Sequence, residues 1–304
     1  MSGIKFDKST IPDLAGRVLL VTGGTGGIGA EITVELARHN PGRILFTGRN
    51  AKSAETTIQR IKTATPDVAV TFVPCDLASL VSVKEAADKI LAECHRLDLF
   101  LPNAGIMAKP ADLSADGYEI HFATNHMGHA LLTKKLLPLL EQTADLPNSD
   151  VRIIYTTSLG WRAGNLDFQR LKTRMESAVL GRWARYCNSK LANVLYAREL
   201  SRRYPKMLSF SVHPGGVSTG LVNDLKLTDR IFVYVSMLGK IITPEQGTFN
   251  HLWAVSTPRE SIKPGGFYEP VGIASLEELA IAKENKFAQQ LWEYTDKELE
   301  KWMA

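Results

Sequence analysis

Tyr186 and Lys190 stand four residues apart in a stretch with helical character, and this spacing suggests acid–base chemistry. On a helix, residues i and i+4 share one face, so the ammonium of Lys190 can lie beside the phenol of Tyr186. A neighbouring cation favours the ionised phenol and lowers a pKa that is otherwise near ~10. Taken alone, the pair fits a surface helix with a snorkelling lysine better. The surrounding motifs favour the chemical interpretation.

The range Thr22–Gly29 is a glycine-rich turn, and it provides the second chemical signal. Its glycines fit both the common dinucleotide fingerprint and a more widely spaced variant of it. In either case, glycines let the backbone approach a pyrophosphate, whose charge the amides of the next helix would face. The strand before the turn and the helix after it favour a cofactor site over an ordinary glycine-rich hairpin. The residues predicted to bind a dinucleotide here are Gly23, Thr25, Gly27, Ile28 and Gly29.

The segment after the second predicted strand bears on the choice of cofactor. It offers no carboxylate for a ribose 2′-hydroxyl, whereas Arg49, with Lys52 one turn on, could bind a 2′-phosphate through charge-assisted hydrogen bonds. We therefore expect NADP(H) rather than NAD(H), against the alternative of a solvated arginine at a helix start. Asp76, followed by Leu77 after the third strand, is expected either to accept from the adenine amine or to cap the next helix.

These motifs lie on an alternation of apolar runs and helical patterns, which predicts an α/β fold: a doubly wound Rossmann-type domain with a seven-stranded parallel sheet flanked by helices. Ligands of such sheets bind beyond the carboxyl ends of the strands. The strands are expected at 17–22, 43–47, 69–74, 98–102, 151–158, 208–213 and 266–268, and long helices at 27–39, 79–96, 114–141 and 181–203.

Composition narrows the possible functions. The chain has 304 residues without a linker or repeat, so we expect one domain over 1–304. Its 36 basic and 32 acidic residues give a net charge of +4, spread along the chain, which does not favour nucleic-acid binding. Three cysteines without framework spacing, and no leader-like segment, suggest a cytoplasmic protein. The apolar run 231–242 is too short for a membrane span, which needs ~20 residues.

In combination, these motifs resemble the short-chain dehydrogenase/reductase family over nearly the whole chain. The turn at Thr22–Gly29 looks like the family's cofactor turn, and Asn103-Ala104-Gly105 looks like its Asn-Ala-Gly signature. The segment 214–219 is similar to the one that contacts nicotinamide. The cofactor-binding residues that the resemblance adds are Asn103, Ala104, Gly105, Tyr186, Lys190, Val217 and Thr219.

The resemblance also implies four catalytic roles. Tyr186 would be the general acid/base that exchanges a proton with the substrate oxygen during hydride transfer. Ser158 would hydrogen-bond that oxygen, with Thr157 as the less favoured rival. Lys190 would bind the nicotinamide ribose and lower the pKa of Tyr186. Asn125 would hold a water that links Lys190 to solvent.

The 28 positions from Ser158 to Tyr186 exceed the family's common spacing and resemble the retinol-dehydrogenase-like branch and its fungal relatives. The extra residues, about 161–180, are expected to form a rim over the site, and the apolar segment at about 221–243 is expected to form a substrate lid. We therefore expect an apolar, aromatic or polyketide-like carbonyl, or the corresponding alcohol, as substrate. The alternative is an NADP(H)-binding redox sensor or a non-redox catalyst on the same fold.

Two further expectations concern metals and assembly. His121, His126 and His129 lie on one predicted helix, but their spacing and the lack of an accompanying carboxylate motif favour structural histidines over zinc ligands. A possible homodimer follows from an apolar face that extends past the sheet. The alternative is that the rim or a C-terminal helix near 287–302 covers this face. The residues of the apolar face are Leu131, Leu132, Leu136, Leu139 and Leu195.

Overall fold

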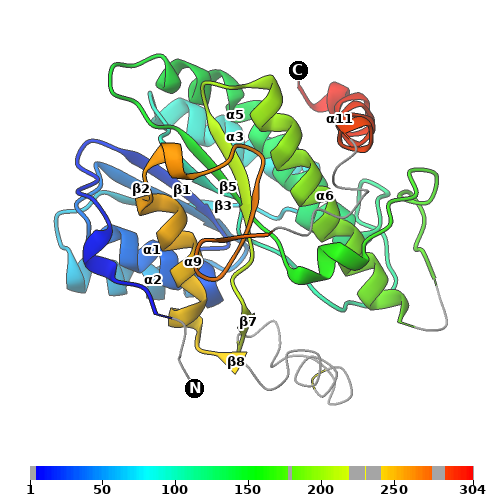
Figure 1. The fold of residues 1–304 in the computed structure, drawn as a ribbon, viewed down its shortest axis with the longest axis horizontal. Helices are drawn as coiled ribbons and strands as arrows, with labels where there is room; N and C mark the ends of the chain where they lie inside the picture. The colour runs from blue at the N-terminus through cyan, green and yellow to red at the C-terminus, as the bar shows by residue number, and fades with distance from the viewer. Residues whose placement is uncertain (1–4, 177–179, 219–229, 231–240, 276–284, 304) are drawn as a thin grey trace.

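The fold is built around an eight-stranded sheet (Figure 1). The structure is a computed structural model that describes residues 5–176, 180–218, 230, 241–275 and 285–303. The strands lie in the order β10-β9-β6-β5-β4-β1-β2-β3, and β10 is the strand that runs antiparallel to its neighbour. The predicted parallel α/β sheet is therefore confirmed, with one further strand at its edge.

The strands agree with the predicted positions to within one or two residues at most ends. They are β1 (Val18–Thr22), β2 (Arg43–Gly48), β3 (Val70–Pro74), β4 (Leu99–Leu101), β5 (Arg152–Thr156), β6 (Leu208–Val212), β9 (Phe267–Glu269) and β10 (Ile273–Ala274). A separate parallel pair consists of β7 (Gly216–Val217) and β8 (Ile241–Ile242). Apolar residues run almost continuously along the central strands because both faces of the sheet are covered.

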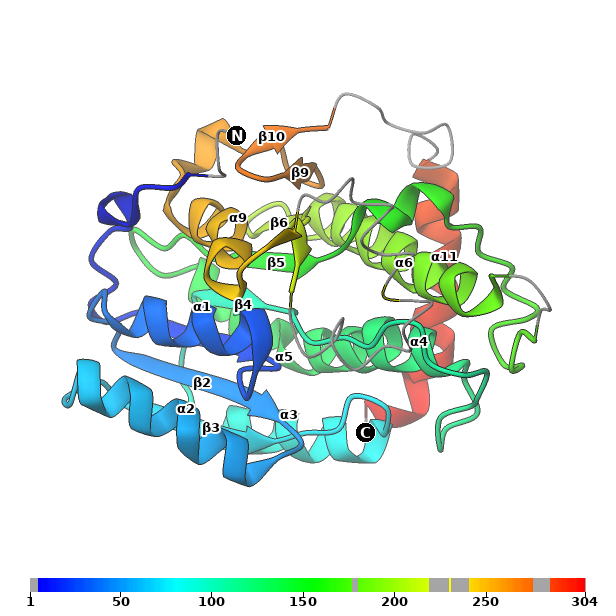
Figure 2. The same cartoon turned by 90° about the horizontal axis from the view of Figure 1, so that it is seen from below.

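Helices cover both faces of the sheet, as predicted (Figures 1 and 2). One face carries α1 (Gly27–Ala37), α2 (Ala51–Ala64) and α9 (Pro244–Ser256), and their apolar residues share a core cluster with the strands. The other face carries α3 (Leu80–Glu93), α5 (Gly128–Ala144) and α6 (Gly181–Arg203), with α11 (Asn285–Leu299) packed on the outside of α6. Both α2 and α9 are additions to the helices predicted from the sequence.

Capping residues fix where several helices begin. The Asn50 side chain accepts a hydrogen bond from the Ser53 amide and starts α2. The Ser79 side chain does the same for α3 through the Ser82 amide. Thr243 and Gln246 form a reciprocal capping box that starts α9. These caps place the first turns of α2 and α3 just beyond the carboxyl ends of β2 and β3.

The helix predicted from Ser114 begins later, at Ile120. A tight turn precedes it, in which the Gly117 amide donates to the Ser114 carbonyl at 3.0 Å and Gly117 has a φ of +82°. Beyond α4 (Ile120–Phe122), the residues Ala123–Met127 form a π-helical segment that runs into α5. Such segments interrupt the regular i to i−4 bonding and often mark functional positions.

The apolar face expected to support a homodimer is not exposed. Its five leucines, 131, 132, 136, 139 and 195, are each at most 5% exposed within a single chain. The C-terminal helix α11 packs on α6 (Figure 1), with Trp292 stacked on Tyr196 at 4.9 Å and the Thr295 hydroxyl hydrogen-bonded to His126, whereas α3 packs on α5, which carries four of the five leucines. The alternative expectation, coverage by a C-terminal helix, therefore fits the α6 side of this face only.

Among the described residues, no helix combines the length and the apolar character that crossing a membrane would need.

Candidate active site

A cleft of about 350 Å³ lies at the carboxyl ends of the central strands, where the fold class predicts a ligand site. Most residues predicted to bind the cofactor line it together, although they come from distant parts of the chain. They are Gly23, Thr25, Gly27, Ile28, Gly29, Arg49, Asp76, Leu77, Asn103, Ala104, Gly105, Tyr186 and Lys190.

The remaining predicted cofactor residues lie elsewhere. Lys52 is exposed in the first turn of α2 and is not among the residues that line the cleft. Val217 is buried in β7. Thr219 lies outside the described residues, as does the predicted lid at 221–243 apart from 230 and 241–243.

Asp76 does not cap the helix that follows it. Its carboxylate accepts from the Ala78 amide at 3.0 Å, while Ser79 provides the cap of α3. Of the two expectations for Asp76, capping is therefore wrong. Asp76 instead lines the cleft beside Cys75 and Leu77.

The glycine turn has the shape that a pyrophosphate requires. A methyl group at Gly29 would lie 2.3 Å from the Gly23 carbonyl oxygen, so only glycine lets the turn and the helix pack this closely. A methyl group at Gly26, in contrast, would meet nothing within 4 Å. Gly26 is also the N-cap of α1 and supplies no side-chain hydrogen bond, so the first amides of α1 are available to an anion in the cleft.

A chain of hydrogen bonds ties the turn to the helix that carries Asn125. The Thr22 hydroxyl oxygen accepts from the amides of Asn103 and Ala104, at 2.8 and 3.0 Å. The same hydroxyl lies 2.8 Å from His129 Nε2, so its own proton points to that nitrogen. His129 Nδ1 therefore carries the ring proton and donates to the Asn125 carbonyl at 3.0 Å. Burial lowers the pKa of His129 to about 4, which agrees with a neutral ring.

The Asn125 side chain is held within the π-helical segment by three hydrogen bonds to two residues. Its Nδ2 donates to the Ile106 carbonyl at 3.0 Å and to the Ser189 hydroxyl at 2.8 Å, and its Oδ1 accepts from the Ile106 amide at 2.8 Å. Both amide protons are thus in use, which leaves one Oδ1 lone pair for a water. A methyl group at Gly105 would lie 3.0 Å from Asn125 Oδ1 and 3.3 Å from Lys190 Nζ, so both atoms border one point of the backbone.

Lys190 is buried at the inner end of the cleft. Its ammonium donates to the Thr156 carbonyl at 3.2 Å and lies 5.8 Å from the centroid of the Tyr186 ring. The same carbonyl accepts from Asn193 Nδ2 at 3.3 Å. Burial lowers the pKa of Lys190 to about 8, since the charged form loses its hydration.

Tyr186 lies beside Ser158. A methyl group at Gly160 would lie 3.6 Å from Ser158 Oγ and 3.8 Å from Tyr186 Cε1. Burial raises the pKa of Tyr186 to about 12, and a hydrogen bond with Ser158 partly offsets this shift. Burial therefore determines the direction of this pKa shift, and the lowering effect of Lys190 that the resemblance implies stays a prediction.

Ser158 and its rival Thr157 have different surroundings. The Thr157 hydroxyl donates to the Lys190 carbonyl at 2.9 Å and is thereby engaged with the backbone of α6. Ser158 Oγ accepts from the Gly160 amide at 3.2 Å and bonds with Tyr186. The arrangement favours Ser158 for the substrate role.

Comparison with known proteins gives this geometry a family. The pattern described as short chain dehydrogenase matches residues 17–168. The chain belongs to the short-chain dehydrogenase family. It is 33% identical to the short-chain dehydrogenase/reductase drtF of Aspergillus calidoustus, over 96% of each chain. It is 34% identical to human retinol dehydrogenase 11, over 92% of this chain and 85% of that protein. Among solved structures, an uncharacterised protein of Mycobacterium paratuberculosis superposes with a TM-score of 0.75 at 26% identity, over 97% of both chains.

This short-chain dehydrogenase contains site residues that sequence reasoning missed. The Thr156 carbonyl holds Lys190, and the Ile106 backbone and Ser189 hold Asn125. Ser189 has a detectable signal, since it stands three residues after Tyr186 on the same helix. Thr156 and Ile106 act through their backbones, for which a sequence has no signal.

The three helical histidines make bonds within the dehydrogenase. His121 Nδ1 lies 2.7 Å from Glu119, and His126 Nε2 lies 3.0 Å from the Thr295 hydroxyl. With His129 engaged as described, each ring has a protein partner. Over the described ranges, no cluster of three His, Cys, Asp or Glu side chains is placed to hold a metal ion.

A small apolar cluster includes Tyr186 and is separate from the two large core clusters. Met107 and Ala108 pack with Tyr186, and the partly buried Trp183 and Cys187 of α6 pack against them. We refer to these five residues as the apolar cluster. It places carbon-rich surface directly beside the phenol.

Proposed function

We propose that the protein is an NADP(H)-dependent oxidoreductase that interconverts an apolar or aromatic ketone or aldehyde and the corresponding alcohol. One observation carries the proposal: Tyr186, hydrogen-bonded to Ser158 and close to Lys190, lines the same cleft as the glycine turn and Arg49. The cofactor, when bound, supplies or accepts the hydride.

In the direction of reduction, Tyr186 donates its proton to the substrate oxygen as negative charge develops there. The raised pKa keeps the phenol protonated at neutral pH, so Tyr186 carries the proton that it donates. Ser158 donates a second hydrogen bond to the same oxygen and orients the carbonyl. Lys190 holds the ribose of the nicotinamide half, and Asn125 keeps the neighbouring backbone at Ile106 in place.

The preference for NADP(H) rests on Arg49. This arginine is exposed, lines the cleft and directly follows β2, where a dinucleotide's adenosine ribose lies in this fold class. A guanidinium binds a 2′-phosphate through two parallel hydrogen bonds and has no such partner in NAD(H). Lys52, outside the cleft, has the smaller role.

The apolar cluster supports the proposed substrate class. Its members surround Tyr186 with methylene, thioether, thiol and aromatic groups. A flat or chain-like apolar carbonyl would bury carbon surface there, which favours binding by roughly 25 cal/mol per Å².

The proposal is tested by NADPH oxidation with a panel of aryl and aliphatic carbonyls at neutral pH, with NADH in parallel. We expect turnover with NADPH and an aryl aldehyde or ketone, and a lower kcat/KM with NADH. Binding of NADPH without turnover of any member of the panel would favour the alternative, a cofactor-binding sensor.

A further inference from the structure

We propose that Arg185 is a positioning residue that holds Met107 and Ala108 of the apolar cluster against α6, beside Tyr186. Through this cluster it determines how tightly the substrate binds. This inference rests on the proposed function, because it assigns substrate to the apolar surface beside Tyr186. It concerns a residue that contacts neither the cleft nor the catalytic side chains.

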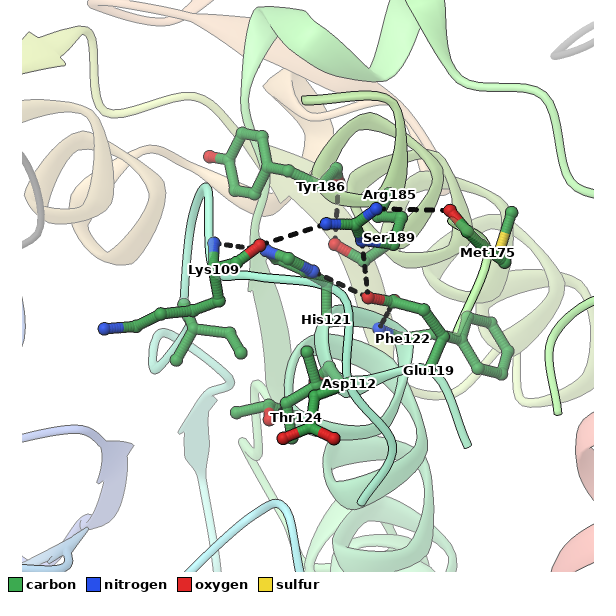
Figure 3. Close-up of polar contacts among 12 residues, drawn as sticks. Lys109, Asp112, Glu119, His121, Phe122, Thr124, Met175, Arg185, Tyr186 and Ser189 are labelled. Atoms are coloured by element: carbon green, nitrogen blue, oxygen red, sulfur yellow. Dashed lines mark hydrogen bonds and ion pairs between the residues drawn. The ribbon is translucent and has the colours of Figure 1, made fainter. Parts of the chain in front are cut away.

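Arg185 is almost wholly buried and bridges three segments that are distant in sequence (Figure 3). Its Nη2 donates to the Lys109 carbonyl at 3.1 Å, and its Nη1 donates to the Met175 carbonyl at 3.2 Å. Its Nε lies 3.3 Å from Glu119 Oε1. One guanidinium thus connects the segment after β4, the rim and the start of the Asn125 helix.

Arg185, Glu119 and His121 form one buried polar group, which we call the hub. The Lys109 amide donates to His121 Nε2 at 3.0 Å, so that nitrogen is an acceptor and the ring proton is on Nδ1. His121 Nδ1 then donates to Glu119 Oε1 at 2.7 Å, while Glu119 Oε2 accepts from the Phe122 amide at 2.8 Å. The carboxylate therefore has its partners built in, and both the amide and the carbonyl of Lys109 are held.

The two loops that Arg185 holds contain strained backbone. Ala108 has a φ of +52° and Met175 a φ of +48°, in the left-handed region that side chains other than glycine rarely adopt. Such conformations persist where the surroundings over-determine them. Arg185 donates to the Met175 carbonyl itself and to the carbonyl of the residue that follows Ala108.

The rim has two further attachments near the same place. The Asn165 amide donates to Asn188 Oδ1 at 2.8 Å, and the Glu119 amide donates to the Leu171 carbonyl at 2.9 Å. The rim is therefore attached to α6 at Asn165 and to Glu119 at Leu171, in addition to its hydrogen bond with Arg185 at Met175. Substitution of Arg185 would release only the Met175 end.

This geometry separates substrate binding from cofactor binding. Met107 and Ala108 lead directly into Lys109, and the other members of the apolar cluster lie on α6 with Arg185. The glycine turn and Arg49 have no contact with the hub among the hydrogen bonds and ion pairs described above. Loosening Arg185 should weaken the packing of this cluster beside Tyr186 and leave the cofactor end unchanged.

The experiment compares the wild type with Arg185→Lys and with the double variant Arg185→Met/Glu119→Gln, which leaves no buried charge unpaired. Arg202→Met is the matched control, because Arg202 forms an ion pair with Glu199 at the distant end of α6. The probes are NADPH, propanal and one aryl aldehyde, para-nitrobenzaldehyde. Hydrogen exchange of residues 106–112 and 165–176 reports on the two segments that Arg185 holds, independently of turnover.

We expect both Arg185 variants to exchange faster in these two segments and to raise the KM for the aryl aldehyde at least ~10-fold, with kcat and the NADPH Kd within ~3-fold. The KM for propanal should change less, because a small substrate contacts fewer atoms of the apolar cluster. Unchanged exchange, faster exchange with unchanged KM, or an equal loss of NADPH affinity would each overturn the inference. If the wild type turns over neither aldehyde but binds NADPH, the proposed function fails, while the exchange data still judge the hub.

Discussion

Lys190 Nζ lies 5.8 Å from the centroid of the Tyr186 ring and donates to the carbonyl oxygen of Thr156 at 3.2 Å. The ammonium is thus held by the end of β5, and burial of the phenol determines its acidity. With a pKa raised to about 12, Tyr186 is protonated at neutral pH. This state suits a group that donates a proton to a carbonyl oxygen.

Replacing Tyr186 with phenylalanine removes that proton donor and leaves the ring in the apolar cluster. We expect turnover of an aryl aldehyde to fall at least ~10²-fold, the lower range for removing a general acid. NADPH affinity, measured by fluorescence titration, should stay within a few-fold because the ring still packs beside Lys190. Activity equal to that of the wild type would remove Tyr186 from the mechanism.

The pH dependence should differ between the two directions of the reaction. Reduction needs protonated Tyr186, and its raised pKa maintains that form across pH 6 to 9, so loss of this proton should not slow reduction there. Alcohol oxidation needs the phenolate, whose fraction increases tenfold per pH unit below the pKa. Initial rates of oxidation should therefore rise with pH over the same range. An oxidation rate that is flat from pH 7 to 9 would contradict a phenol that must ionise.

Arg49→Asp should move the cofactor preference toward NADH. The substitution replaces attraction with repulsion at the 2′-phosphate and supplies an acceptor for a 2′-hydroxyl. The ratio of kcat/KM for NADPH to that for NADH should fall at least ~10-fold, since charged hydrogen bonds contribute ~1.5–3 kcal/mol. Lys52→Ala is the control, and its effect should be small because Lys52 lies outside the cleft. A larger effect of Lys52→Ala would exchange the two roles.

Sequence patterns predict the fold and most of the cleft because these depend on local signals. Strands and glycine turns have a characteristic period and composition, so the positions of residues such as Gly29 and Asn103 follow from the amino-acid sequence itself. The pKa of Tyr186 could not be predicted in the same way. Helical spacing shows that Lys190 is near, whereas the dominant effect is burial, which depends on the packing of the whole site.

The hub around Arg185 had no sequence signal either. Its partners are two backbone carbonyls, at Lys109 and Met175, and a carboxylate 66 positions away at Glu119. The prediction of an exposed leucine face failed for a related reason. Helical periodicity identifies an apolar face, but it does not identify which segment covers that face. Here α3 packs against α5, which carries four of the leucines, and α11, far along the chain, packs against α6.

Leu132→Asp tests whether this leucine face is buried within a single chain. Leu132 is fully buried in one chain, so a carboxylate there would be placed without a partner, at an expected loss of at least ~3 kcal/mol in the free energy of unfolding. Leu146→Asp is the control at a position that is 39% exposed, and it should have little effect. Urea unfolding followed by tryptophan fluorescence measures both. A fully stable Leu132→Asp protein whose mass in light scattering is halved would instead place Leu132 in a dimer interface.

Stability should decrease in mild acid because buried histidines are neutral in the folded protein. Burial lowers the pKa of His126 and His213 to about 3, and that of His129 and His251 to about 4. In the unfolded chain these rings take up protons below their usual pKa of 6.5, so the unfolded state binds more protons than the folded state between about pH 4 and 6.5. The stabilisation is complete above that window and decreases as pH falls through it, by at most ~1.4 kcal/mol per pH unit for each histidine.

Urea midpoints from pH 7 to 5 measure this slope. His129→Gln preserves one acceptor toward Thr22 and one donor toward the Asn125 carbonyl, and it should make the slope shallower by up to one proton. His95→Gln, at an exposed position, controls for the substitution itself. A slope that does not change in His129→Gln would mean that this ring is protonated in the folded protein. In that case Nε2 would also carry a proton, and the Thr22 hydroxyl could no longer donate to it.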